Sequence, residues 1–303
     1  MVEVVVGIVV ALAAFGVGMR FGRRAEGAGG PRPAAALAPQ PSLRDGHRPL
    51  SEADLPDAAT VRSAMTGGEF AYHVQPIWNV ETGRMIGVEA LSRWLRADGS
   101  IGLPETFLTQ ITRSYADGGT PPMDRAGATA RPFTDAGLFC AFNLSSQFLD
   151  RSATDAAWMD DLLGALAPDR IVFEITEGAT ISHPDRTARL IDALRERGVR
   201  FALDDFGTGL SNLERLQTYP VDFVKLDRRF VQGIGAGRDV GILKALVGLS
   251  EDLSFDVIAE GIEAEDERDR IRAAGIVLQQ GYLHGRPGPV DDWAARIGER
   301  LEA

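Results

Sequence analysis

The 303-residue chain has few of the residues that build thiolate and histidine sites: one cysteine, Cys140, and four histidines. A single cysteine excludes an intrachain disulfide and a thiolate metal cluster. The four histidines are scattered and no HExxH pattern occurs, so structural or surface roles are expected for them. A Walker A loop, GxxxxGK[ST], is also absent, which excludes that mode of nucleotide binding.

Basic residues are also in short supply. Lys and Arg total 32 against 43 Asp and Glu, giving a formal net charge of −11 at pH 7. Binding to a nucleic acid polymer needs a basic surface, so such a partner is not expected. A phosphate-bearing small substrate stays compatible with this charge, because bound divalent cations reverse the local sign.

The N-terminus carries an apolar run at residues 4–19, followed by Arg20, Arg23 and Arg24. We interpret residues 1–24 as a single transmembrane helix with its basic flank, although the run is slightly shorter than the roughly 17–25 residues that usually span a bilayer. Arginines favour the cytoplasmic side, which places the chain in the inner (cytoplasmic) membrane with its remainder in the cytoplasm. A cleaved signal peptide is the alternative, but Glu3 precedes the run and no small-residue cleavage site directly follows it.

Residues 25–50 are rich in Pro, Ala and Gly and lack a periodic apolar pattern. This composition predicts a flexible linker. Residues 51–303 have the pattern of one folded domain.

Eight short apolar runs alternate with amphipathic segments in this domain, which is typical of a mainly parallel sheet covered by helices. Helices are expected at 186–198, 239–253 and 264–275. Eight runs over this length fit a (β/α)8 TIM-type barrel, with an open doubly wound sheet as the alternative. The runs are 70–77, 85–91, 138–144, 170–176, 199–205, 221–227, 255–261 and 277–283.

Nearly every run ends in a side chain suited to metal or phosphate. The carboxyl ends of parallel barrel strands meet at one rim, so residues far apart in sequence converge there. The converging residues are Glu89, Asn143, Glu174, Asp204, Asp205, Lys225, Glu260 and Gln280.

Only hard oxygen ligands are available at this rim, which favours Mg²⁺ or Mn²⁺ over zinc. Adjacent Asp204 and Asp205 can serve two ions, and a two-ion site supports phosphodiester hydrolysis. Lys225 would hold the attacking water or a phosphate oxygen. Any one of these acids, taken alone, is better explained as an ordinary paired or solvated surface group.

The motifs resemble those of the EAL-domain cyclic di-GMP phosphodiesterase family. The resemblance extends over roughly residues 55–300 and follows the family's order. The matching segments are QPI (75–77), VEALSR (88–93), NLS (143–145), EITE (174–177), DDFGTG (204–209), VKLD (224–227), AEGIE (259–263) and QGYLHGRP (280–287).

The resemblance implies a barrel whose first strand runs opposite to the others, a homodimer formed through the barrel, and conversion of cyclic di-GMP to linear pGpG. It implies one metal on Glu89, Asn143, Glu174 and Asp204, and a second on Asp204 and Asp205. Glu260, Lys225 and Asp205 would carry catalysis. Substrate would contact Gln75, Leu91, Arg93, Glu263 and Gln280, and the loop would be supported by Glu177, Phe206, Gly207, Thr208 and Gly209.

One departure concerns residues 109–137, which fit the family's helical pattern poorly and put two helices in question. Two other functions stay open within the family: a catalytically silent cyclic di-GMP receptor and an interaction scaffold. An unrelated metal-dependent barrel hydrolase is the alternative outside it.

Overall fold

A computed structural model describes residues 56–107, 111, 123–144, 163–164, 166–176, 183–207, 212–233 and 238–301. The predicted membrane segment and linker lie outside these ranges, as do Glu177, Thr208 and Gly209. Within the described ranges, no helix is long and apolar enough to cross a membrane.

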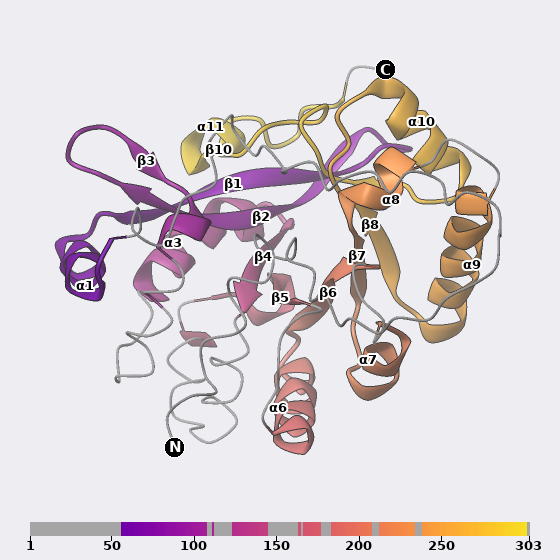
Figure 1. Ribbon diagram of the computed structural model, residues 1–303, viewed down its shortest axis with the longest axis horizontal. Coiled ribbons are helices and arrows are strands. Elements are labelled where there is room, and N and C mark those ends of the chain that lie inside the picture. The colour runs from indigo at the N-terminus through magenta and orange to yellow at the C-terminus, as the bar shows by residue number, and fades with distance from the viewer. Residues whose placement is uncertain are drawn as a thin grey trace, which may run out of the picture.

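The described strands form a closed barrel (Figure 1). The ring runs in the order β1, β9, β8, β7, β6, β5, β4, β2 and closes through a β1–β2 pairing, while β3 and β10 pair outside it. The strands are β1 (Phe70–Asn79), β2 (Arg84–Leu95), β3 (Ile101–Gly102), β4 (Phe139–Leu144), β5 (Ile171–Thr176), β6 (Arg200–Phe206), β7 (Phe223–Leu226), β8 (Asp256–Ala259), β9 (Leu278–Gln279) and β10 (Gly288–Pro289).

Strand β1 runs antiparallel to both of its ring neighbours, β2 and β9, whereas the pairs from β2 through β4 to β9 are parallel. The barrel prediction and the implied reversal of the first strand are therefore confirmed. The open doubly wound sheet is wrong, because an open sheet has two free edges and this ring has none.

Helices lie around the barrel (Figure 1). The three helices expected from periodicity are confirmed to within two residues at each end, as α6, α9 and α10. The described helices are α1 (Ala58–Gly67), α3 (Met123–Asp135), α6 (Pro184–Glu196), α7 (Asn212–Thr218), α8 (Arg228–Gly233), α9 (Arg238–Leu253), α10 (Glu265–Ala273) and α11 (Val290–Ala294), with 3-10 turns η2 (Pro104–Thr106) and η3 (Pro168–Arg170).

Helix α3 falls in the segment whose helical pattern looked poor. It forms despite Pro132 in its interior, which costs a backbone hydrogen bond. Ala126, Ala130 and Phe133 are buried at spacings of four and three residues, so they give α3 one apolar face toward the barrel. The doubt about this part of 109–137 was wrong because local propensity was outweighed by tertiary packing.

The barrel interior is filled by one apolar layer. Gly87 leaves room for the Phe139 ring there, since a Cβ on Gly87 would lie 2.5 Å from ring atoms. The layer consists of Ile77, Phe139, Ala141, Val172, Ala202, Phe223 and Ile258, all buried.

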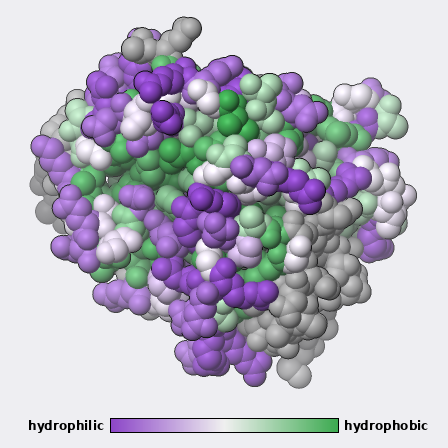
Figure 2. Space-filling view, turned by 180° about the vertical axis from the view of Figure 1, so that it is seen from behind, coloured by the Kyte–Doolittle hydropathy of each residue, from purple (hydrophilic) through white to green (hydrophobic). Residues whose placement is uncertain are grey.

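Few large hydrophobic side chains are exposed on the part of the chain that the structure describes. Among the described residues, Leu95, Ile101, Ile242 and Leu253 are the exposed ones. Figure 2 shows the rear face, where hydrophilic residues occupy most of the periphery and hydrophobic ones appear between them.

Candidate active site

The polar residues of the rim sit two positions beyond the apolar layer. Strand side chains alternate between the two faces, so a residue two steps on from an inward apolar residue also points inward. Asn143 follows Ala141 in this way, and Lys225 follows Phe223. The same step places Glu174, Asp204, Glu260 and Gln280 beyond Val172, Ala202, Ile258 and Leu278.

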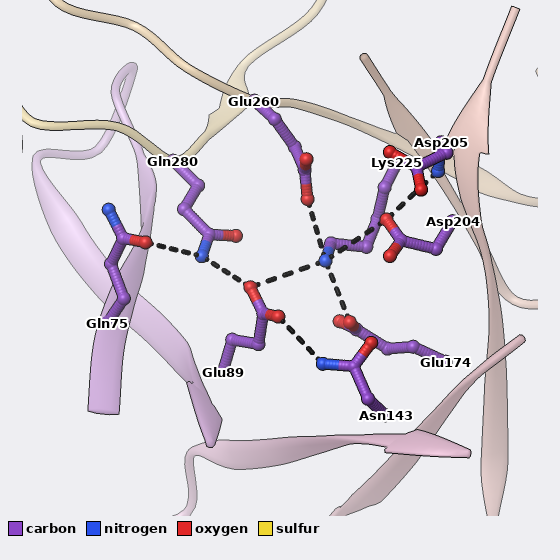
Figure 3. Close-up of polar contacts among 9 residues, drawn as sticks. All are labelled: Gln75, Glu89, Asn143, Glu174, Asp204, Asp205, Lys225, Glu260 and Gln280. Carbon is purple, nitrogen blue, oxygen red and sulfur yellow. Dashed lines mark hydrogen bonds and ion pairs between the residues drawn. The ribbon is translucent and has the colours of Figure 1, made fainter. Parts of the chain in front are cut away.

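Lys225 lies at the centre of this group (Figure 3). Its Nζ is 2.6 Å from Glu260 Oε1 and 2.7 Å from Glu174 Oε2. Glu89 Oε2 and Asp204 Oδ1 each lie 3.3 Å from the same nitrogen. With Lys225 only 1% exposed, one buried ammonium group serves four carboxylates.

Besides Lys225, a chain of hydrogen bonds holds Glu89 in place. Asn143 Nδ2 donates to Glu89 Oε1 at 3.0 Å, and Gln280 Nε2 donates to Glu89 Oε2 at 2.7 Å. Gln280 Nε2 also lies 3.2 Å from Gln75 Oε1, and Gln75 Nε2 donates to the carbonyl oxygen of Gly285 at 3.0 Å. Glu89 therefore has a fixed orientation, in keeping with the support that metal-binding carboxylates usually receive.

Asp204, Asp205 and Glu260 form a second grouping beside Lys225. One carboxylate oxygen from each lies within 4.8 Å of the other two, a separation from which a single cation can contact all three. Asp205 has φ 59°, a left-handed conformation that Asp tolerates better than most residues. Its backbone N–H donates to Asp204 Oδ1 at 3.0 Å.

Burial and mutual repulsion shift the protonation of the site. Burial raises the pKa of Glu174 well above its usual range, and the nearby Glu89 carboxylate raises it further. Burial likewise raises the pKa of Glu260 to about 8, although the Lys225 ammonium opposes the shift. Burial alone would lower the pKa of Lys225, but the carboxylates around it, Asp204 first, hold it well above its usual value.

The donor set fits divalent cations. Five carboxylates surround one ammonium group, so the ionised site carries excess negative charge that needs compensation. Asn143 uses its amide nitrogen toward Glu89 and so presents its amide oxygen as a ligand atom. The donors are all hard oxygens, which Mg²⁺ and Mn²⁺ prefer.

The remaining predicted site residues that the structure describes lie outside the ring around Lys225. Leu91 and Arg93 continue the inward face of β2 beyond Glu89, with Leu91 half-buried and Arg93 7% exposed. Phe206 and Gly207 follow Asp205 at the end of β6, as expected. Glu263 is exposed at the start of α10, where its backbone N–H donates to Glu267 Oε2.

Sequence reasoning assigned Gln75 and Gln280 to substrate and missed that they also support Glu89. The signal was the antiparallel β1–β2 register, which pairs Gln75 directly with Glu89. Their substrate roles, together with those of Leu91, Arg93 and Glu263, stay predictions.

Comparison with known proteins assigns the family. The model of the EAL domain matches residues 58–287. The chain is 34% identical over 249 residues to cyclic di-GMP phosphodiesterase RocR of Pseudomonas aeruginosa, covering 80% of this chain and 63% of that protein.

Two solved structures are similar along most of the chain. The PaMucR phosphodiesterase in complex with c-di-GMP has 30% identity and a TM-score of 0.66, covering 78% of this chain and 98% of that one. The Klebsiella pneumoniae BlrP1 complex with manganese and cyclic di-GMP has 31% identity and a TM-score of 0.64, covering 74% and 57%. The chain thus spans less than two thirds of the length of RocR and of BlrP1. With a match over most of its length and an intact charged rim, the chain belongs to the EAL domain family.

Proposed function

We propose that this chain hydrolyses cyclic di-GMP to linear pGpG in a reaction that depends on divalent cations. The observation that carries the proposal is the ring of five carboxylates and one lysine at the carboxyl end of the barrel. The relatives named as cyclic di-GMP phosphodiesterases support the choice of substrate.

Two cations, Mg²⁺ or Mn²⁺, would be held at this ring. The first would use Glu89, Asn143, Glu174 and Asp204, and the second Asp204 and Asp205 with Glu260 beside them. When bound, such ions polarise a phosphoryl oxygen and stabilise the charge that develops during displacement.

Lys225 and Glu260 would handle the attacking water. Lys225 keeps its proton at Nζ and donates a hydrogen bond, either to the water or to a phosphate oxygen. Glu260 would accept the water's proton at its carboxylate. Burial raises the pKa of Glu260 to about 8, near the working range of a general base. Added positive charge would lower that pKa and keep Glu260 ionised.

The phosphodiester would lie over the inward face of β2. Arg93 supplies a guanidinium group there that can pair with phosphate, and Leu91 supplies apolar contact. Gln75 and Glu263 would contact the dinucleotide. Gln280, which donates a hydrogen bond to Glu89, would contact it as well.

The direct test incubates the purified chain with cyclic di-GMP and Mg²⁺ or Mn²⁺ and separates the nucleotides by chromatography. Formation of pGpG, and its loss when EDTA removes the cations, is the expected result. Retained binding without product would contradict hydrolysis and establish a receptor. Loss of binding as well would leave an interaction scaffold.

We also propose that residues 4–19 anchor the chain in the inner membrane, so that it lowers the messenger near the bilayer, and that two chains pair through the barrel. The arginine flank after an apolar run supports the anchor. Fractionation of cells expressing the chain, with and without residues 1–24, tests it. Light scattering of the purified protein tests the dimer, and a monomer at all concentrations would exclude it.

A further inference from the structure

Helix α8 lies against the turns that follow two acids of the site, Asp205 and Glu260. The chain enters α8 directly after Lys225, Leu226 and Asp227 at the end of β7. In the barrel, β7 lies between β6, which ends near Asp205, and β8, which leads into Glu260. Figure 1 shows α8 at the end of β7.

Each of these two acids is followed by a glycine in a left-handed conformation. Gly207 comes two residues after Asp205 and has φ 99°, and Gly261 comes directly after Glu260 and has φ 70°. Residues other than glycine rarely adopt such φ angles. The backbone therefore turns beyond both acids in a way that favours glycine. What packs against these turns therefore influences where the acids point.

Residues of α8 occupy the space at both glycines. A Cβ on Gly207 would lie 1.8 Å from a ring carbon of Phe230, so the ring rests directly on the glycine backbone. A Cβ on Gly261 would lie 2.4 Å from the Cβ of Arg228. Neither approach tolerates a side chain on the glycine.

Backbone hydrogen bonds join the same three segments. The N–H of Asp227 donates to the carbonyl oxygen of Phe206 at 3.4 Å, and the N–H of Glu260 donates to that of Leu226 at 3.0 Å. The turn into α8 is tied down as well, since the N–H of Arg229 donates to Asp227 Oδ1 at 2.9 Å. The start of α8 is thus bonded to both acid-bearing strand ends.

We propose that Phe230, supported by Arg228, is a positioning residue that fixes the distance between Asp205 and Glu260 and so prepares that pair for a divalent cation. This inference rests on the proposed function for its catalytic consequence. Phe230 would act through the backbone of Gly207, against which its ring packs.

Ordinary core packing is the competing explanation for Phe230. The ring is half-buried and packs against the cluster that includes Val231, Leu243 and Ala259. Leu249 on α9 packs against the same cluster and is also half-buried, whereas the three atoms nearest to a Cβ on Gly207 all belong to Phe230. Leu249→Ala is therefore a matched control for loss of packing alone.

The test compares Phe230→Ala, Phe230→Leu and Leu249→Ala with the unchanged chain. Mn²⁺ affinity is measured by calorimetric titration without nucleotide, thermal unfolding by circular dichroism, and turnover of cyclic di-GMP at saturating Mn²⁺. We expect Phe230→Ala to weaken Mn²⁺ binding about 10-fold, the lower end of the effect seen when the support of a metal site is removed. Leu249→Ala should lower the unfolding temperature while Mn²⁺ affinity stays within about 2-fold.

Phe230→Leu keeps an apolar side chain over Gly207 and should recover part of the lost affinity. If Phe230→Ala does not fold, Phe230→Leu against Leu249→Ala carries the test, with about a 3-fold loss expected. Equal Mn²⁺ affinity in the Phe230 and Leu249 variants would overturn the proposal. The titration needs no substrate, so a chain that binds Mn²⁺ but leaves cyclic di-GMP intact would refute the proposed function while still testing the role of Phe230.

Discussion

The two ends of the barrel surround a cationic side chain in opposite ways. At the carboxyl end, Lys225 is buried among four carboxylates at 2.6–3.3 Å. At the other end, the guanidinium of Arg200 lies 5.2 Å from the ring centroid of Phe139 and 5.3 Å from that of Phe223. Both rings belong to the apolar layer that separates the two ends.

The difference lies in the charge balance. The carboxyl end has more acids than Lys225 can neutralise. Burial, and then repulsion from neighbouring carboxylates, raises the pKa of Glu174 and of Glu260. At the opposite end, burial lowers the pKa of Arg200, and Asp222 opposes that shift. Arg200 Nε is buried without a hydrogen-bond partner among the described residues. The surplus of carboxylates at the carboxyl end can be offset by added cations, while at the opposite end Arg200 faces aromatic rings.

The cavity at the Arg200 end does not coincide with the reactive groups. A cavity of about 420 Å³ lies at the Arg200 end, lined by residues that include Asp222, Phe223 and Asp256. The reactive groups lie on the other side of the apolar layer. Charge surplus, and not hollow volume, identifies the functional end.

Glu89→Ala should have the largest effect and tests whether the carboxyl end of the barrel carries the reaction. It removes a cation ligand whose orientation Asn143 and Gln280 fix, and we expect turnover to fall by at least about 100-fold. Steady-state kinetics with cyclic di-GMP measure the loss. Glu81→Ala is the control, because Glu81 is an exposed acid in the turn between β1 and β2 at the opposite end. Unchanged rates in Glu89→Ala would remove the ring from the reaction.

Lys225→Met tests what the central ammonium contributes to stability. Removing one partner of buried ion pairs leaves uncompensated charge, so the free energy of unfolding without divalent cations should fall by about 3–5 kcal/mol. Urea unfolding measures it, and added Mn²⁺ should restore part of the loss. Lys244→Met changes an exposed lysine on α9 and should leave stability nearly unchanged. Equal stability of the two variants would show that the acids of the ring already share protons among themselves.

Most of the carboxylate ring around Lys225 was predictable from the sequence, because alternate side chains of a strand point to the same face. Each ligand-type residue ends an apolar run, and parallel strands bring their carboxyl ends together. Helices α6, α9 and α10 were also placed correctly, and α6 has the clearest apolar face, with Leu190, Ile191 and Leu194 buried. Residue spacing alone did not show that β1 is reversed; that came from family resemblance.

Three-dimensional relations were not predictable from runs and motifs. Gln75 supports Glu89 through a cross-strand register that depends on where the β1–β2 turn falls. Phe230 meets Gly207 only because α8 folds back over the end of β6. Lys225 was expected beside a water, whereas its position at the centre of four carboxylates depends on side-chain reach within the closed barrel.

The pH dependence of stability offers a smaller effect at the carboxyl end. The pKa of Glu260 is raised from 4.5 to about 8 in the folded chain, so the native state binds more protons than the unfolded state between these values. Stability without divalent cations should therefore fall as pH rises through that window, and Mn²⁺ should stabilise the chain more at its upper end. Glu260→Gln removes the titrating group, so this variant should unfold at a higher temperature than the unchanged chain near the top of the window and at a similar one near the bottom. Parallel melting curves across the whole window would contradict the raised pKa.

Arg200→Met carries the smallest expected effect and tests the other half of the comparison. Losing the contacts with the two aromatic rings costs about 1 kcal/mol, while removing an unpaired buried N–H recovers a similar amount of about 1 kcal/mol. The two nearly cancel, so the free energy of unfolding should change by no more than about 1 kcal/mol, and turnover by no more than about 2-fold. Urea unfolding and steady-state kinetics on the same preparation check both values. A drop in turnover as large as that of Glu89→Ala would mean that the apolar layer transmits changes from one end to the other, and the two ends could no longer be treated as separate.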